Sequence, residues 1–132
     1  MSMSSTPKAT LLACAQAFNN RDADAVVAMS DAMALFEIPM LKPNRLHGHD
    51  EIRRGLQAAF AELGTVAFRL DDPAENGTVA IAEGSLAVTR NSASDKEHYV
   101  GIVAETREGA LVRFSLYLNA RNRRLWSDEA IL

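Results

Sequence analysis

The first part of the chain places its apolar residues at the spacing of helices. Thr6 stands directly before Pro7, and this pair predicts a helix start, because a threonine hydroxyl caps free N–H groups and proline has none to leave unpaired. The apolar residues that follow recur every three or four positions: Leu11, Cys14, Ala15 and Phe18. This spacing puts them on one face of a helix that ends at Asn19–Asp22.

Two further helices and one strand are predicted before residue 64. Asp22 is a suitable N-cap for a short helix over 23–29. A hydrophobic strand then runs to Pro39, and a loop through Lys42 and Pro43 leads to a third helix that starts near Gly48 or His49 and ends at Gly64. The apolar positions of this last helix form one stripe: Ile52, Leu56, Phe60 and Leu63.

The second half of the chain has the pattern of an antiparallel meander. Its alternating segments predict strands over 66–70, 78–90, 97–106 and 110–119. Residues 72–77 predict a turn between the first two strands. Three of these strands are long and must bend, and Gly84 and Gly101 are the expected bend points.

This order of elements predicts an α+β fold in which three N-terminal helices lie across one side of a curved antiparallel sheet. We expect a cone-shaped molecule, because bent strands leave a concave face that the helices do not fill completely. A space of this kind is the usual origin of an internal pocket.

Composition narrows the class of protein. The 132 residues suit one domain, expected over 1–132 with a flexible N-terminus (1–6) and a C-terminal tail (120–132). The net charge of −3 argues against nucleic-acid binding, which calls for a basic face. The single cysteine allows no internal disulfide, no signal-peptide pattern is visible, and no apolar run is long enough to span a membrane. We therefore expect a cytoplasmic protein without a cofactor.

Three segments resemble the nuclear-transport-factor-2-like superfamily, especially its SnoaL-like branch. Residues 18–27 (FNNRDADAVV) resemble the end of the branch's first helix and the start of its second. Residues 47–53 (HGHDEIR) resemble its glycine-led entry into the third helix, and residues 109–119 (GALVRFSLYLN) resemble its closing strand. The resemblance implies the cystatin-like cone of ketosteroid isomerases and polyketide cyclases. The superfamily also includes epoxide hydrolases, dehydratases and non-catalytic domains, so the fold does not settle the function.

The catalytic positions that the resemblance implies are apolar in this chain. Ile38 takes the place of the general-base aspartate of ketosteroid isomerases, and Cys14 that of the tyrosine that holds the enolate oxygen. Ile102 falls near the position of the protonated carboxylic acid, and Leu116 takes the place of the aspartate of epoxide hydrolases. Carboxylate-based catalysis of the known types is therefore not expected, although enzymatic activity of another type stays open.

Alternation along the strands predicts which side chains face the interior. If Ile38, Ile102 and Leu116 face inward, their neighbours two residues away do so too. The residues expected to contact an apolar ligand are then Cys14, Phe18, Phe36, Ile38, Phe60, His98, Ile102, Phe114 and Leu116.

Histidines are the remaining polar candidates for chemistry. His98 has inward parity near a strand end, where it would act as a base or hydrogen-bond donor, or would have no role beside a loop. His47 is a second candidate. His47 and His49 beside Asp50 are also compatible with metal binding, but His49 is equally explained as a helix-start residue, so no metal site is predicted.

The opposite face of the sheet carries large polar side chains. Arg113, Ser115, Tyr117 and Asn119 alternate outward on the last strand. Tyrosine and arginine are frequent at interfaces, and the resemblance implies a homodimer through this convex face. Glu37, in an apolar strand, is expected to pair with Arg113 or Arg69.

Three functions follow as alternatives. The first is a domain that binds a small apolar molecule without catalysis. The second is a cyclase or isomerase that acts on an apolar carbonyl compound with His98 as acid or base. The third is a dimerisation or assembly module without a ligand. An open cavity on the concave side would favour the first two, and a closed core the third.

Overall fold

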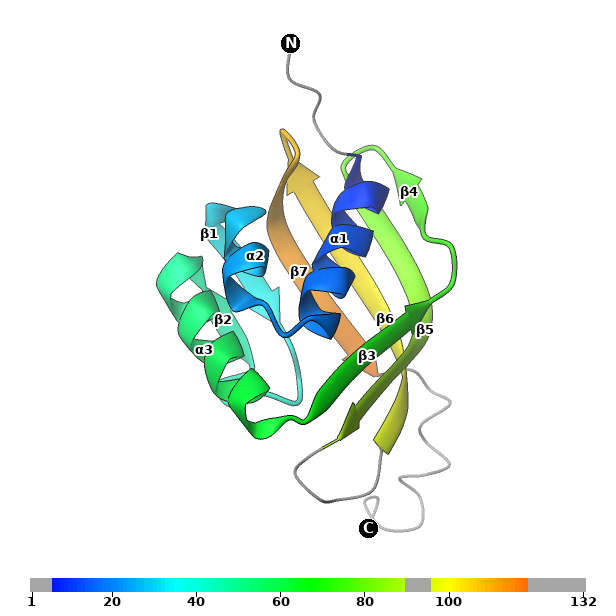
Figure 1. Cartoon of the computed structure of the whole chain (residues 1–132). Helices are drawn as coiled ribbons and strands as arrows, with labels where there is room; N and C mark the ends of the chain where they lie inside the picture. Colours follow the sequence, from blue (N-terminus) through cyan, green and yellow to red (C-terminus); the bar gives the residue numbers. More distant parts are fainter. Residues whose placement is uncertain (1–5, 90–95, 119–132) are drawn as a thin grey trace, which may run out of the picture.

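The computed structural model describes residues 6–89 and 96–118 (Figure 1). Asn119 and the expected tail over 120–132 lie outside the described residues. The elements are α1 (Pro7–Asn19), α2 (Ala23–Ala28), β1 (Ser30–Glu37), β2 (Arg45–His47), α3 (Gly48–Glu62), β3 (Thr65–Leu70), β4 (Ala74–Asn76), β5 (Val79–Thr89), β6 (Lys96–Arg107) and β7 (Ala110–Leu118). In the part of the chain described, none of the helices has the length and apolar character needed to cross a membrane.

Local caps fix the starts of the first two helices, as the sequence predicts. The hydroxyl of Thr6 accepts a 3.0 Å hydrogen bond from the Ala9 amide, and a carboxylate oxygen of Asp22 accepts one of 3.0 Å from Ala25. The third helix ends at Glu62, two residues before the predicted Gly64.

The sheet is curved and mixed, with the strand order β2-β1-β7-β6-β5-β3 and β4 added beside β5 (Figure 1). The predicted meander is confirmed for β5, β6 and β7, which pair antiparallel. The expectation of an antiparallel sheet throughout is wrong at one place, because β1 runs parallel to β7 and sets Phe36 beside Phe114. These strands are far apart in sequence, so no turn between them constrains their relative direction.

Two short strands lie where the sequence predicts only a loop and a turn. β2 pairs antiparallel with β1 and sets Leu46 beside Phe36. β4 pairs with β5 within the predicted turn over 72–77. Each has three residues, too few for an alternating pattern to stand out.

All three helices lie on one face of the sheet (Figure 1). α1 contacts β3, β5 and β6, while α3 contacts β1 and β2. The predicted inward residues of the strands are buried beneath them: Phe36, Ile38, Val100, Ile102, Ala104, Phe114 and Leu116. Leu118 is half-buried and packs against this core. The interior assigned from strand parity is thus confirmed.

Candidate functional site

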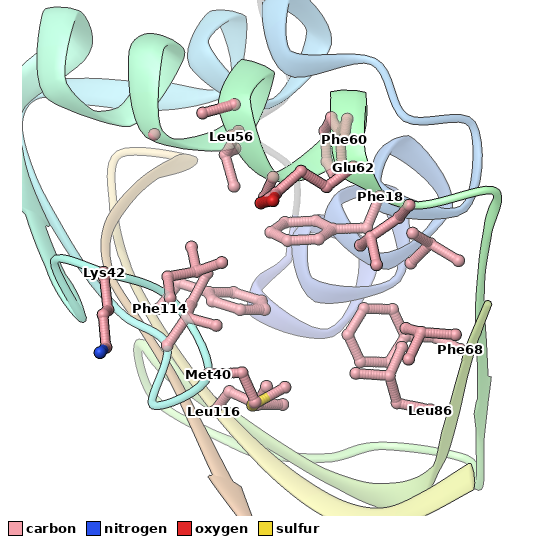
Figure 2. Close-up of a pocket in the computed structure, with 18 of the residues that line it drawn as sticks. Phe18, Met40, Lys42, Leu56, Phe60, Glu62, Phe68, Leu86, Phe114 and Leu116 are labelled. Atoms are coloured by element: carbon pink, nitrogen blue, oxygen red, sulfur yellow. The ribbon is translucent and has the colours of Figure 1, made fainter. Parts of the chain in front are cut away.

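A cavity of about 620 Å3 lies between the helical layer and the concave face of the sheet (Figure 2). Its wall is largely apolar. The sheet supplies a group of inward side chains: Val66, Phe68, Leu86, Val88, His98, Phe114 and Leu116. α1 adds Phe18, the C-terminal half of α3 supplies another side, and residues 40–43 of the β1–β2 loop border the cavity as well. The size is that of pockets that take small organic molecules, roughly 300–1,000 Å3.

Phe18 is the centre of the aromatic part of the wall. Its ring meets Phe60 and Phe68 edge to face, with centroid separations of 5.7 and 5.8 Å. It stacks on Phe114 at 5.5 Å, and Phe114 in turn stacks on Phe36 at 5.1 Å. Figure 2 labels four of these rings, Phe18, Phe60, Phe68 and Phe114. The rings come from α1, α3 and three strands and pack against one another, so they form a fixed apolar surface.

Small residues on α3 leave the space open. Gly55, Ala58 and Ala59 belong to the wall, where larger side chains would extend into the cavity. Gly55 also lets α3 approach β2 closely, because a Cβ there would lie 2.7 Å from a methyl carbon of Leu46. The helix therefore packs tightly at Gly55 while Ala59, one turn further on, borders empty space.

The structure divides the residues expected to contact a ligand. Phe18, Ile38, Phe60, His98, Phe114 and Leu116 line the cavity. Cys14, Phe36 and Ile102 are fully buried in the core and are not among the residues that line the cavity. Inward parity places a side chain on the concave side, but α1 and its neighbours pack directly onto part of that side. Burial also raises the pKa of the Cys14 thiol, which keeps it protonated and unreactive.

The three histidines of the chain have different surroundings. His98 is half-buried in the cavity wall, opposite Leu86 of β5. Its Nδ1 atom is shielded from solvent and has no hydrogen-bond partner among the described residues. His49 instead lies with Nε2 2.8 Å from the Ser30 carbonyl oxygen.

His47, the other catalytic candidate, lies outside the cavity wall. It pairs with Leu35 on β1, whose side chain has the opposite parity to Phe36, so His47 is exposed on the convex side and does not line the cavity. Within residues 6–89 and 96–118, no group of three or more histidine, cysteine, aspartate or glutamate residues is placed to hold a metal ion.

Part of the wall was not predicted. Val66 and Phe68 on β3, and Leu86 and Val88 on β5, alternate as inward pairs, and the same parity rule would have found them. Residues 40–43 carry no such pattern, since they belong to a loop. Lys42 and Glu62 are the charged residues of the described wall; both are exposed, as suits a rim (Figure 2).

A polar network occupies the convex face. Glu37 Oε1 accepts hydrogen bonds from Ser115 Oγ at 2.7 Å and from an Arg113 terminal nitrogen at 3.1 Å. This confirms the predicted pairing of Glu37 with Arg113, and Arg45 also lies 3.7 Å from the second carboxylate oxygen of Glu37. Arg113 also donates to the Tyr117 hydroxyl at 3.4 Å. The bond from Ser115, and then the bond and charge of Arg113, lower the pKa of Glu37 against the opposing effect of burial.

The sequence and the fold agree on the class of protein. The family model of the SnoaL-like domain matches residues 11–115, and the chain belongs to this family. No curated protein matches the sequence.

Solved structures share the architecture at low sequence identity. An LEH-like epoxide hydrolase from M. tuberculosis has a TM-score of 0.74 and 17% identity, over 87% of this chain and 84% of that chain. A putative SnoaL-like polyketide cyclase from Shewanella denitrificans has a TM-score of 0.75 and 10% identity, over 90% and 94%. A protein with a ketosteroid isomerase-like fold from Catenulispora acidiphila, in complex with trimethylamine, has a TM-score of 0.75 and 15% identity, over 86% and 86%. These likenesses concern the fold alone.

Proposed function

We propose that this protein binds a small apolar molecule in the cavity between α3 and the concave face of the sheet. The observation that carries the proposal is the wall itself: an open space of about 620 Å3 bordered by phenylalanine, leucine, valine and alanine side chains. A closed core would have favoured an assembly module instead. Moving an apolar ligand from water into an open apolar cavity of this size is favourable in free energy.

The magnitude of this effect is sufficient for binding. Removing about 300 Å2 of apolar ligand surface from water at about 25 cal/mol per Å2 supplies about 7.5 kcal/mol, before the cost of association. The aromatic surface centred on Phe18 is already packed, so little further ordering of these rings accompanies binding. The apolar wall thus supports affinity without any charged contact.

Binding without carboxylate catalysis is the form of the proposal that the residues support. Ile38 and Leu116 border the cavity at positions where the resemblance implies acidic residues in isomerases and epoxide hydrolases. Glu62 is the only carboxylate of the described wall, and it is exposed at the rim. No carboxylate of that wall is buried among the apolar residues, where its pKa would be raised for general acid chemistry.

A cavity-filling substitution tests the proposal. Ala59→Phe places a ring in the space, whereas Ala61→Phe makes the same change on the same helix at an exposed position off this wall. Titration with the fluorescent apolar probe N-phenyl-1-naphthylamine should give saturable binding by the wild type and by Ala61→Phe. Ala59→Phe should bind at least about tenfold more weakly, because the ring occupies the site. Equal binding by both variants, or no saturable binding by the wild type, would contradict the proposal.

A second candidate function is a cyclase or isomerase that acts on an apolar carbonyl compound. One observation favours it: the wall contains a titratable side chain, His98, that is not bound to another described residue through Nδ1. Incubation with a β,γ-unsaturated ketosteroid in heavy water, followed by NMR, would reveal isomerisation or exchange next to the carbonyl. Turnover by the wild type that is lost in His98→Phe would support this function. Binding without turnover would leave the first proposal in place.

A further inference from the structure

We infer that His98 is the residue that selects the polar group of the ligand, and that the ligand is an uncharged ring compound with a single hydroxyl or carbonyl oxygen. This inference rests on the proposed binding function and adds the chemistry of the ligand to it. His98 stands apart from His49, whose ring already contacts the Ser30 carbonyl, and from His47, which lies on the other face of the sheet.

The imidazole of His98 has hydrogen-bonding capacity that the described protein does not use. Among described residues, two buried side-chain polar atoms lack a partner: Nδ1 of His98 and Oγ1 of Thr10. A buried polar group without a partner costs about 1–3 kcal/mol. Thr10 lies on α1 and does not line the cavity, so a ligand there does not reach it. His98 does line the cavity. A ligand oxygen bonded to Nδ1 would therefore offset part of the free-energy cost of leaving this atom unpaired.

The surroundings of His98 determine which polar groups of a ligand can bind beside it favourably. The wall beside it on the sheet is apolar, with Leu86 as its cross-strand partner and Val88 two residues further along β5. A charged group brought among these side chains would lose its hydration at a cost of several kcal/mol or more. A neutral oxygen gains a hydrogen bond at a smaller cost. Because Nδ1 is shielded from water in this orientation, the ligand oxygen would reach it after the ring turns about its Cβ–Cγ bond.

The charged residues of the wall do not supply this selection. Lys42 and Glu62 are exposed at the rim, where water screens their interactions with a ligand. The resemblance implies polar anchors at Cys14, Ile38, Ile102 and Leu116, and all four are apolar. In this chain, recognition of the ligand's polar group is therefore assigned to His98, near the beginning of β6.

A matched pair of compounds tests the inference. 2-Naphthol and 2-methylnaphthalene have the same ring system and nearly the same size, but only the first has a hydroxyl group. Affinities are measured for the wild type, for His98→Phe, and for the control Thr10→Val, which removes the other unpartnered atom. The affinity ratio of 2-naphthol to 2-methylnaphthalene should fall about threefold to tenfold in His98→Phe, the value of one hydrogen bond. It should be unchanged in Thr10→Val and partly restored in His98→Gln.

The wild type alone gives a second readout that needs no folded variant. Proton–nitrogen NMR spectra of the histidine rings should show a large shift of the His98 nitrogens on addition of 2-naphthol and a small one with 2-methylnaphthalene. Equal ratios in the wild type and His98→Phe, or equal NMR shifts with both compounds, would overturn the role of His98 and leave binding by the cavity intact. If neither compound binds the wild type, the proposed function and this inference both fail.

Discussion

Ser115 donates a 2.7 Å hydrogen bond from its hydroxyl to Glu37, which precedes it by 78 residues. The bond crosses the one parallel strand pair of the described sheet, β1 with β7, where these two residues are register partners. Ser115 was predicted to face outward, and it does lie on the convex side, but it is only 1% exposed. Its bonds with Glu37 and Arg113 explain how a residue on this uncovered face becomes buried.

The hydrogen bonds of Glu37 predict that the free energy of unfolding depends on pH. The lowered pKa of Glu37 means that the folded protein holds this proton less tightly than the unfolded chain does. The ionised carboxylate therefore contributes stability that is fully present above the ordinary pKa of 4.5 and is lost as the pH falls through the lower, folded value. Glu37→Gln should thus be less stable than the wild type near neutral pH, and this difference should shrink below pH 4.5.

Urea unfolding at several pH values measures this difference. Ser115→Ala should also lower the free energy of unfolding, by about 1 kcal/mol near neutral pH, because the carboxylate loses one short hydrogen bond. Glu97→Gln, an exposed glutamate on β6, serves as the control. A wild type and Glu37→Gln that differ equally at every pH would contradict the role of the ionised carboxylate.

Leu116→Asp should destabilise the protein instead of creating activity. Leu116 is 3% exposed among core residues, so the change removes a packed side chain and leaves a carboxylate without a compensating partner. The free energy of unfolding should fall by about 3 kcal/mol or more. Thermal melts of this variant and of Leu12→Asp, at a position 41% exposed on α1, should differ clearly. Identical melts would mean that Leu116 is not inside.

The two predicted bend glycines should respond differently to alanine. A Cβ on Gly84 would lie 2.1 Å from the Arg69 carbonyl oxygen and 2.8 Å from the Leu70 Cα, so backbone would have to move. A Cβ on Gly101 would lie at an ordinary 3.9 Å from its nearest neighbour, the carbonyl oxygen of Ala82. Gly84→Ala should therefore lower the melting temperature markedly, while Gly101→Ala should be neutral or slightly stabilising. A reversed order would contradict the β3–β5 packing.

We propose that the convex face of the sheet binds a second copy of this chain. The helices cover the other face, and large side chains are exposed on this one: Ile81 at 52%, Tyr117 at 48% and Tyr99 at 39%. Tyr117→Asp would place a charge at the centre of the contact, at a cost of about 2 kcal/mol or more. Sedimentation at micromolar concentration should give a dimer for the wild type and for Leu12→Asp, but a monomer for Tyr117→Asp. A monomeric wild type would refute the proposal. Asn119, expected on the same face, lies outside the described residues.

The inward and outward faces of the strands could be predicted because side chains alternate strictly along a strand. Taking Ile38 and Leu116 as inward was enough to place Phe36 and Phe114 correctly. The helix caps could be predicted because they depend on neighbouring residues only. The parallel pairing of β1 with β7 could not, since it depends on contacts between distant segments.

The candidate site was predictable only in part. Parity separates the concave from the convex side, but it does not say where helices fill the concave side and where space remains. Phe36 and Ile102 are inward and yet packed under other residues, whereas Phe114 reaches the cavity. The loop that contributes Met40 has no periodic pattern, so its position beside the cavity follows only from the three-dimensional structure.

The place of β1 in the sheet has a consequence for synthesis on the ribosome. β1 lies between β2 and β7, and its register with β7 runs from Ser30 beside Leu111 to Glu37 beside Ser115. The chain must therefore be made almost to residue 118 before an early strand finds its second neighbour. Until then β1 keeps an unpaired edge, the kind of surface that other chains bind during aggregation. A nascent chain that stops before Ala110 also lacks Phe114 and Leu116, so it cannot close the wall of the cavity.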